Sequence, residues 1–164
     1  GGPVVVNGPL GRMVVVGSVD QKVYSIGASS GGFLWSFQGD AWFWADPVAD
    51  DAFIYAATIG STVFALDRRG LQVWKHVLEG GSPVVSGPLV LGDDVVVATD
   101  EGKLYRLDAD SGSRIGGFQD LSGRIKAPLS HLGGTVFVGV EDNTVRGIDL
   151  DDWREAWNIS TKDR

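Results

Sequence analysis

Residues 87–105 read GPLVLGDDVVVATDEGKLY, a stretch in which three short apolar runs are separated by two turns. The runs are rich in Val and Leu, and the turns consist of Gly, Asp and Glu, which is the pattern of consecutive β-hairpins. A third turn, residues 108–112, leads to residues 113–118, which we expect to form a fourth strand. No segment keeps a 3.6-residue periodicity over a dozen residues, so we expect almost no helix.

This pattern occurs four times. Its third apolar run recurs at residues 23–26, 63–66, 104–107 and 145–148, with first positions 40, 41 and 41 residues apart. A proline precedes each run, at Pro9, Pro47, Pro88 and Pro128. A tryptophan follows three of the runs, at Trp35, Trp74 and Trp157, and Gly116 takes the Trp position in the third copy. A period near 40 indicates a module that buries its apolar surface only by stacking on its neighbours.

The apolar runs also indicate how the modules stack. Residues 14–16 and 95–97 are uninterrupted Val, whereas a strand with one wet face alternates apolar and polar residues. Both faces of each sheet are therefore expected to be covered, as in a β-propeller blade. We predict an all-β propeller of four-stranded antiparallel blades, approximately 1–40, 41–80, 81–121 and 122–160, in one segment, 1–164. The recurring Trp side chains are expected on the outermost strands, each with its N–H near a backbone acceptor.

Composition excludes several classes of function. The net charge of −7 argues against a nucleic-acid partner, because no basic patch is available to neutralise phosphates. The chain has no Cys and therefore no disulfide or thiolate chemistry. No run of about 18 apolar residues is present, so we expect no membrane span. The sequence begins directly in repeat sequence, which we interpret as a cut through a longer protein or as a mature end.

Residues suited to catalysis are few and scattered. His76 and His131 are the only histidines and lie in different repeats. The acidic pairs stand where turns are predicted, at Asp50-Asp51, Asp93-Asp94 and Glu141-Asp142. Residues 108–112 begin like a Ca²⁺-binding loop but lack the distal Glu that such a loop requires. We predict no catalysis and no metal site within this chain.

Two segments resemble a known repeat. Residues 65–74, with Asp67, Gly70 and Trp74, and residues 106–112, with Asp108 and Gly112, resemble the tryptophan-docking motif of the PQQ-like β-propeller repeat. The resemblance covers residues 1–160 and includes Asp149 in the fourth copy. The first copy lacks the turn Asp, and the fourth reads Asp151-Asp152-Trp153 where Thr-Gly is typical.

The PQQ-like family includes quinoprotein alcohol dehydrogenases and non-enzymatic, BamB-like proteins. The resemblance implies an eight-bladed ring, of which four blades are half, and it favours an extracytoplasmic location. The open half-ring would be covered by missing blades of its own ring or by a second copy in a homodimer; a narrow closed four-bladed monomer is the alternative. We expect a non-catalytic module that binds a protein or peptide, without PQQ or Ca²⁺. The alternative function is a fragment of a quinoprotein-type or multidomain enzyme whose catalytic residues lie outside this chain.

Specificity is expected where the copies differ most. Residues 41–46 read AWFWAD at the position expected for an innermost strand, so Trp42, Phe43 and Asp46 are predicted near the central channel, with Trp44 packed between blades. Arg124 and Lys126 are two same-face cations expected on the innermost strand of the fourth copy. As a site, the aromatics would receive a peptide or aromatic group and the cations an anionic group. The alternative is that the aromatics fill local space and the cations pair with neighbouring acids.

Overall fold

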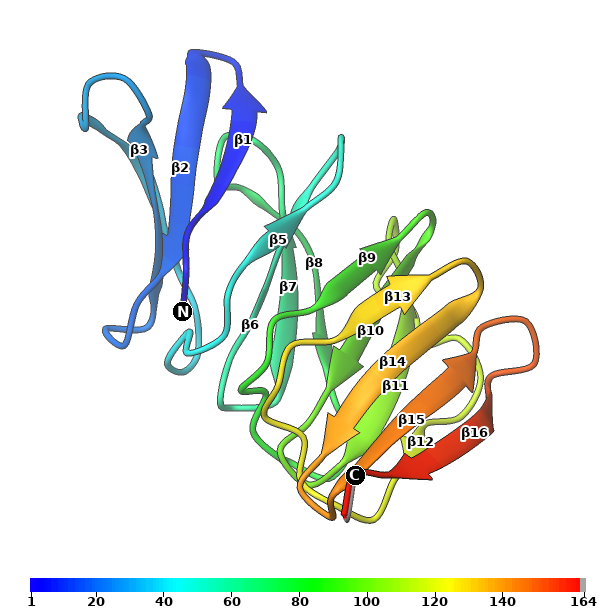
Figure 1. The fold of residues 1–164 in the computed structure, drawn as a ribbon. Coiled ribbons are helices and arrows are strands. Elements are labelled where there is room, and N and C mark those ends of the chain that lie inside the picture. The colour runs from blue at the N-terminus through cyan, green and yellow to red at the C-terminus, as the bar shows by residue number, and fades with distance from the viewer. Residues whose placement is uncertain (163–164) are drawn as a thin grey trace.

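A computed structural model describes residues 1–162 of the chain as four separate antiparallel sheets arranged side by side in an arc, with the N-terminus at the first sheet and the C-terminus at the last (Figure 1). No residue in this described range lies in a helix. The prediction of an all-β propeller built from four-stranded blades is therefore confirmed.

Each blade is a meander in which the strands pair in chain order. Blade 1 consists of β1 (Val4–Gly8), β2 (Gly11–Gly17), β3 (Lys22–Gly27) and β4 (Phe33–Gln38). Blade 2 consists of β5 (Val48–Ala49), β6 (Ile54–Ala57), β7 (Thr62–Leu66) and β8 (Gln72–Val77). Blade 3 consists of β9 (Leu89–Leu91), β10 (Asp94–Ala98), β11 (Lys103–Asp108) and β12 (Gln119–Asp120). Blade 4 consists of β13 (Ser130–Leu132), β14 (Thr135–Val140), β15 (Thr144–Asp149) and β16 (Arg154–Ser160).

The core lies between blades rather than inside one. In β10, Val95 and Val97 pack against blade 2, whereas Val96 and Ala98 pack against blade 4. A third cluster joins blades 1 and 2 around Phe64. Alternate residues of one strand thus face opposite neighbours, which explains why the central strands are apolar throughout.

Tryptophan links consecutive blades at their outer edge. The indole nitrogen of Trp35 donates to the carbonyl oxygen of Arg68 at 3.2 Å, and that of Trp74 to the carbonyl oxygen of Ala109 at 2.8 Å. Each indole covers a glycine of the next blade, Gly70 or Gly112, at which a Cβ would come within 2.5 Å of the ring. Both glycines have positive φ, +80° and +69°, so the position excludes side chains on conformational as well as steric grounds.

The link between blades 3 and 4 runs in the opposite direction. Blade 3 carries Gly116 in place of Trp, and blade 4 carries Trp153 in place of the glycine, at φ +55°. The indole nitrogen of Trp153 donates back to the carbonyl oxygen of Gly117 at 2.7 Å. Residues 113–118, expected to be a strand, form only an isolated bridge between Leu107 and Arg114, and the fourth strand of blade 3 is limited to β12. That prediction was wrong because the two glycines let the chain bend away from the sheet.

The innermost strands also start later than the sequence suggested. Residues 41–46 and 123–127 are not strands; they are linkers that precede β5 and β13. The first linker is hydrogen-bonded to turns between strands instead. The N–H of Phe43 donates to the carbonyl of Ser18, in the turn between β2 and β3, at 3.1 Å, and the N–H of Ile59, in the turn between β6 and β7, donates to the carbonyl of Trp42 at 3.0 Å. The placement of Trp42, Phe43, Arg124 and Lys126 on or beside innermost strands therefore has to be corrected to these linkers.

Candidate binding site at the central opening

The linkers of blades 2, 3 and 4 converge around one opening near the middle of the arc. It has a volume of about 440 Å³ and is lined by Trp44, Ile59, Pro83, Val85, Asp100, Arg124 and Lys126. One aromatic residue and three aliphatic ones thus share a concave surface with three charged side chains. Clefts with apolar walls and a few placed polar groups are the usual form of ligand sites.

Alternation along the linkers decides which side chains reach this opening. Phe43, Val84 and Ile125 are buried between blades, and the neighbouring residues Trp44, Val85 and Lys126 face outward. The buried set is held close to the preceding blade, since a Cβ on Gly17 would lie 2.7 Å from Cβ of Phe43. In each linker, one side chain is therefore buried between blades and the side chain that follows it is exposed at the opening.

The two predicted cations are already paired with acids. Arg124 Nη2 lies 2.5 Å from Asp100 Oδ2, and Lys126 Nζ lies 2.8 Å from Glu141 Oε1. Glu141 also approaches Arg124, at 3.9 Å from Nε. The hydrogen bond to Asp100 and the attraction of that carboxylate raise the pKa of Arg124. The four charges balance, so this geometry supports the interpretation of pairing with neighbouring acids over a free site for an anion.

The predicted aromatic residues lie elsewhere than expected. Trp44 is 54% exposed at the opening rather than packed between blades, and Phe43, expected near the channel, is 1% exposed in the core of blades 1 and 2. Trp42 is 47% exposed outside the set that lines the opening. Asp46 accepts a hydrogen bond from the backbone N–H of Gly2, beside the start of blade 1. The structure therefore brings together Arg124, Lys126 and Trp44.

Val85, Asp100 and Glu141 were missed as members of this region. No sequence feature marks Val85 as part of the opening, because a Val in a linker cannot be distinguished by sequence from a Val in a strand. The sequence predicts turns at Asp100 and Glu141, and both residues do lie in the turns that follow β10 and β14. Arg124 reaches Asp100 of the preceding blade, whereas Lys126 reaches Glu141 in the β14–β15 turn of the blade that its own linker leads into. No local sequence signal marks either pairing.

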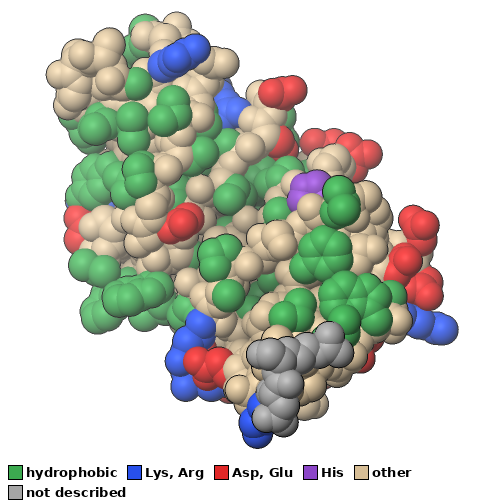
Figure 2. Space-filling view, in the orientation of Figure 1, with side chains coloured by type: hydrophobic (Ala, Val, Ile, Leu, Met, Phe, Trp, Pro, Cys, Tyr) green, Lys and Arg blue, Asp and Glu red, His purple; other side chains and the backbone are tan. Residues whose placement is uncertain are grey.

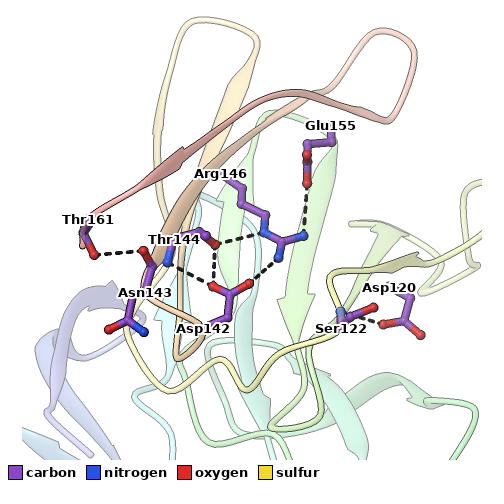
Figure 3. Close-up of polar contacts among 8 residues, drawn as sticks. All are labelled: Asp120, Ser122, Asp142, Asn143, Thr144, Arg146, Glu155 and Thr161. Carbon is purple, nitrogen blue, oxygen red and sulfur yellow. Dashed lines mark hydrogen bonds and ion pairs between the residues drawn. The ribbon is translucent and has the colours of Figure 1, made fainter. Parts of the chain in front are cut away.

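A second charged cluster closes blade 4 (Figure 3). Arg146 takes the position held by Tyr105 in blade 3, and its guanidinium contacts Asp142 at 2.5 Å and Glu155 at 3.2 Å. A hydrogen bond from Thr144 holds the pKa of Asp142 below its usual range, and Arg146 acts in the same direction. All four residues belong to blade 4, so the cluster joins its strands rather than forming a site.

Residues 1–162 contain no group of three or more His, Asp and Glu side chains placed to hold a metal ion. Within the same residues the structure has no helix long and apolar enough to cross a lipid bilayer.

Comparison with known proteins agrees with the fold. The family model described as outer membrane protein assembly factor BamB matches residues 1–117 and, in a second match, 86–163. The outer membrane protein assembly factor BamB of Nitrosomonas eutropha is 27% identical over 159 residues, which is 94% of this chain and 37% of that protein.

Solved structures place the arc within larger proteins. The crystal structure of BamB from Moraxella catarrhalis matches with a TM-score of 0.76 at 21% identity, over 98% of this chain and 50% of that one. The computationally designed Ika8 protein matches with a TM-score of 0.80 at 19% identity, over 90% of this chain and 46% of that one. Quinohemoprotein alcohol dehydrogenase from Comamonas testosteroni matches with a TM-score of 0.79 at 16% identity, over 96% of this chain and 34% of that one. The chain spans half or less of each of these relatives.

Proposed function

This chain belongs to the family of outer membrane protein assembly factor BamB, and on that premise we propose that it is a non-catalytic propeller module that binds a protein or peptide segment. The relative from Nitrosomonas eutropha is named for the assembly of outer membrane proteins. We extend that role to this chain as a scaffold in the same process, in an extracytoplasmic compartment.

The observation that carries the proposal is the position of Trp44 among the charged pairs of the central opening. Its indole is half exposed in the same concave surface as Val85 and Arg124. Trp and Arg are the residues that most often dominate the binding energy of protein interfaces, because both combine a large contact area with a polar group. An exposed Trp that the repeat does not require for blade packing is therefore best explained by a partner.

The chemistry of the opening also indicates the kind of partner. Trp44 and Val85 offer an apolar surface for an aliphatic or aromatic side chain. The Arg124–Asp100 and Lys126–Glu141 pairs present both signs of charge at the rim, so they fit the alternating donors and acceptors of a peptide backbone better than a single anionic group. We propose an extended peptide segment or loop as the ligand.

Peptides that tile the sequence of an outer membrane β-barrel protein provide a direct test. The chain is immobilised and each peptide's affinity is measured by biolayer interferometry. Trp44→Ala and Arg124→Glu should weaken the peptides that bind by at least about tenfold, the typical loss for a central interface residue. Leu71→Ala is the matched control, because Leu71 is exposed next to the outermost strand of blade 2, away from the opening. Equal affinity for all four proteins, or no binding by any peptide, would count against this function.

A further inference from the structure

A smaller cavity lies between blades 1 and 2, away from the central opening. It has a volume of about 210 Å³. Blade 2 lines it with the two arginines of the β7–β8 turn, and blade 1 lines it with Pro9, Leu10, Met13, Leu34 and Trp35. Figure 2 shows basic side chains where the upper end of blade 1 meets blade 2. Both walls belong to consecutive blades of this chain, so the cavity is a feature of an internal blade interface.

The next blade interface shows what fills the corresponding space. Tyr55 and Trp74 both pair with Ala65, and their side chains lie toward blade 3 with 5.9 Å between ring centroids. The hydroxyl of Tyr55 donates to the carboxylate of Asp50, in the β5–β6 turn, at 2.6 Å. The ring of Tyr55 therefore occupies the space between the tryptophan and this turn.

Blade 1 has no such ring. Val15 and Trp35 both pair with Ser25, so Val15 stands at the position of Tyr55. At the corresponding place in the β1–β2 turn, Leu10 stands where blade 2 has the aspartate. The cavity is bounded by Trp35 and Leu10, which correspond to the two residues between which Tyr55 lies. It therefore occupies the space that the missing ring would fill.

The cavity also contains a cation that lacks a carboxylate partner. Arg69 forms an ion pair with Asp67 at 3.0 Å, but none of the ion pairs among the described residues includes Arg68. Nη2 of Arg68 donates to the backbone carbonyl of Asp50, and Nη1 is buried without a hydrogen-bond partner in residues 1–162. The carboxylate of Asp50 attracts Arg68 but is hydrogen-bonded to Tyr55 instead. A buried guanidinium N–H without an acceptor is unfavourable, so an anion in the cavity would stabilise it.

We propose that this cavity binds a small carboxylate that carries a single aromatic ring. The ring lies against the indole of Trp35 and the thioether of Met13, where the next interface has the ring of Tyr55, and the carboxylate accepts from the guanidinium of Arg68. The size agrees, because a cavity of about 150 Å³ holds benzene and this one is somewhat larger. The inference is independent of the proposed function, because the cavity shares no lining residue with the central opening.

Titration of the 164-residue chain with phenylacetate, followed by heteronuclear NMR, tests the proposal. The indole N–H signal of Trp35 should shift saturably, with a Kd of about 0.1–1 mM for a ligand of this size, and that of Trp44 should stay in place. Phenethyl alcohol, which has the ring without the charge, should bind at least about tenfold more weakly. Acetate, which has the charge without the ring, should also bind at least about tenfold more weakly.

Two variants separate the charge from the cavity. Arg68→Gln should weaken phenylacetate at least about tenfold and leave phenethyl alcohol unchanged, because it removes only the charged donor. Arg154→Gln is the matched control, since it makes the same change of charge at an exposed residue at the start of β16. Met13→Phe gives blade 1 the ring that blade 2 has at Phe53, and it should weaken both ligands because the added ring fills the cavity.

The opposite results would overturn the proposal. They are the absence of a saturable shift of Trp35 at about ten times the expected Kd, or equal affinity of Arg68→Gln and the unmodified chain for phenylacetate. Saturable shifts at Trp44 that Trp44→Ala abolishes would place the ligand at the central opening and contradict the proposal. Circular dichroism checks the folding of each variant; if Met13→Phe does not fold, the comparison of Arg68→Gln with Arg154→Gln decides.

Discussion

The indole N–H of Trp74 donates a 2.8 Å hydrogen bond to the carbonyl oxygen of Ala109 in the next blade. The hydroxyl of Tyr55 reaches the same carbonyl at 3.3 Å, and the two aromatic rings lie against each other with 5.9 Å between centroids. Trp74 is 7% exposed. One backbone carbonyl of blade 3 thus receives two donors from blade 2.

Two substitutions of Trp74 should distinguish the contribution of its hydrogen bond to stability from that of its packing. Trp74→Phe keeps a ring but loses the donor, so we expect the free energy of unfolding to fall by about 1 kcal/mol plus the cost of the smaller ring. Trp74→Ala should cost about 3–5 kcal/mol. Urea denaturation measures both. Trp157→Ala, at a more exposed Trp, should cost less than Trp74→Ala in the monomer, and equal losses would contradict the docking role of Trp74.

Two glycines with the same backbone conformation distinguish steric from conformational cost. Gly112 and Gly116 both have φ +69°, but only Gly112 lies under an indole; apart from Gly116 and its two chain neighbours, no described residue has an atom within 4 Å of the Cβ position of Gly116. Alanine at either should cost about 1–2 kcal/mol for the left-handed backbone. Gly112→Ala should cost about 1–3 kcal/mol more, because the added Cβ overlaps Trp74. Similar stabilities of the two variants in urea would show that the glycine is required for its φ alone.

Trp42 and Phe43 are adjacent in sequence and should respond differently to truncation. Phe43→Ala should lower the free energy of unfolding by about 3–5 kcal/mol, because the ring fills the core between blades 1 and 2 and contacts Phe64. Trp42→Val should change it by no more than about 1 kcal/mol, because the side chain is half exposed. Thermal or urea unfolding decides, and the reverse order would mean that the linker register differs from the one described.

Asp50 should make part of the stability dependent on pH. Burial raises the pKa of Asp50, but the hydrogen bond from Tyr55 at 2.6 Å, the N–H groups of Phe53 and Ala52 and the charge of Arg68 outweigh it, so the pKa lies below the ordinary value of 3.8. The contribution of a carboxylate with a lowered pKa is complete above 3.8 and is lost as the pH falls through the folded-state value.

Asp50→Asn tests this dependence. The variant should be less stable than the unmodified chain at pH 7, and the difference should shrink as the pH is lowered below about 4. Urea unfolding at a series of pH values measures it, with Asp51→Asn, at an exposed neighbour, as the control. A difference that stays constant down to about pH 3 would contradict the role of the ionised carboxylate.

Added PQQ with Ca²⁺ should not stabilise the chain. We expect no cofactor, because the sequence supplies neither a Cys pair nor a Ca²⁺ loop with its distal Glu. Thermal unfolding is monitored with and without both components. Tight binding at a hundredfold excess over Kd would add about 2.7 kcal/mol and raise the melting temperature by several degrees. A saturable rise of that size would favour the quinoprotein-fragment alternative.

The sequence alone determined the repeat, the strand type and the stacking of blades. These follow from local signals, because short Val-rich runs between Gly and Asp turns form hairpins wherever they lie, and uninterrupted apolar runs require cover on both faces. The Trp35 and Trp74 contacts were also predictable, since a tryptophan that recurs at the repeat period serves packing. Predicting these features requires strand and turn positions only to within a few residues, and the sequence repeat gives positions to that accuracy.

Only the tertiary structure decided which side chain faces the opening. Along an extended linker, a shift of one residue exchanges the buried and the exposed set, and no local signal distinguishes Trp42, Phe43 and Trp44. The pairing of Arg124 with Asp100 likewise depends on how blade 4 is placed against blade 3, and that of Lys126 with Glu141 depends on how the linker passes the β14–β15 turn of blade 4. The reversed contact from Trp153 to Gly117 was not predictable either. It depends on two departures from the motif, Gly116 in blade 3 and Trp153 in blade 4, which only the structure brings together in one interface. The register of each linker and the rotation of each blade are set by packing between blades. The spacing of the repeat does not fix the linker register to within one residue, and a shift of one residue moves a side chain from the core to the surface of the opening.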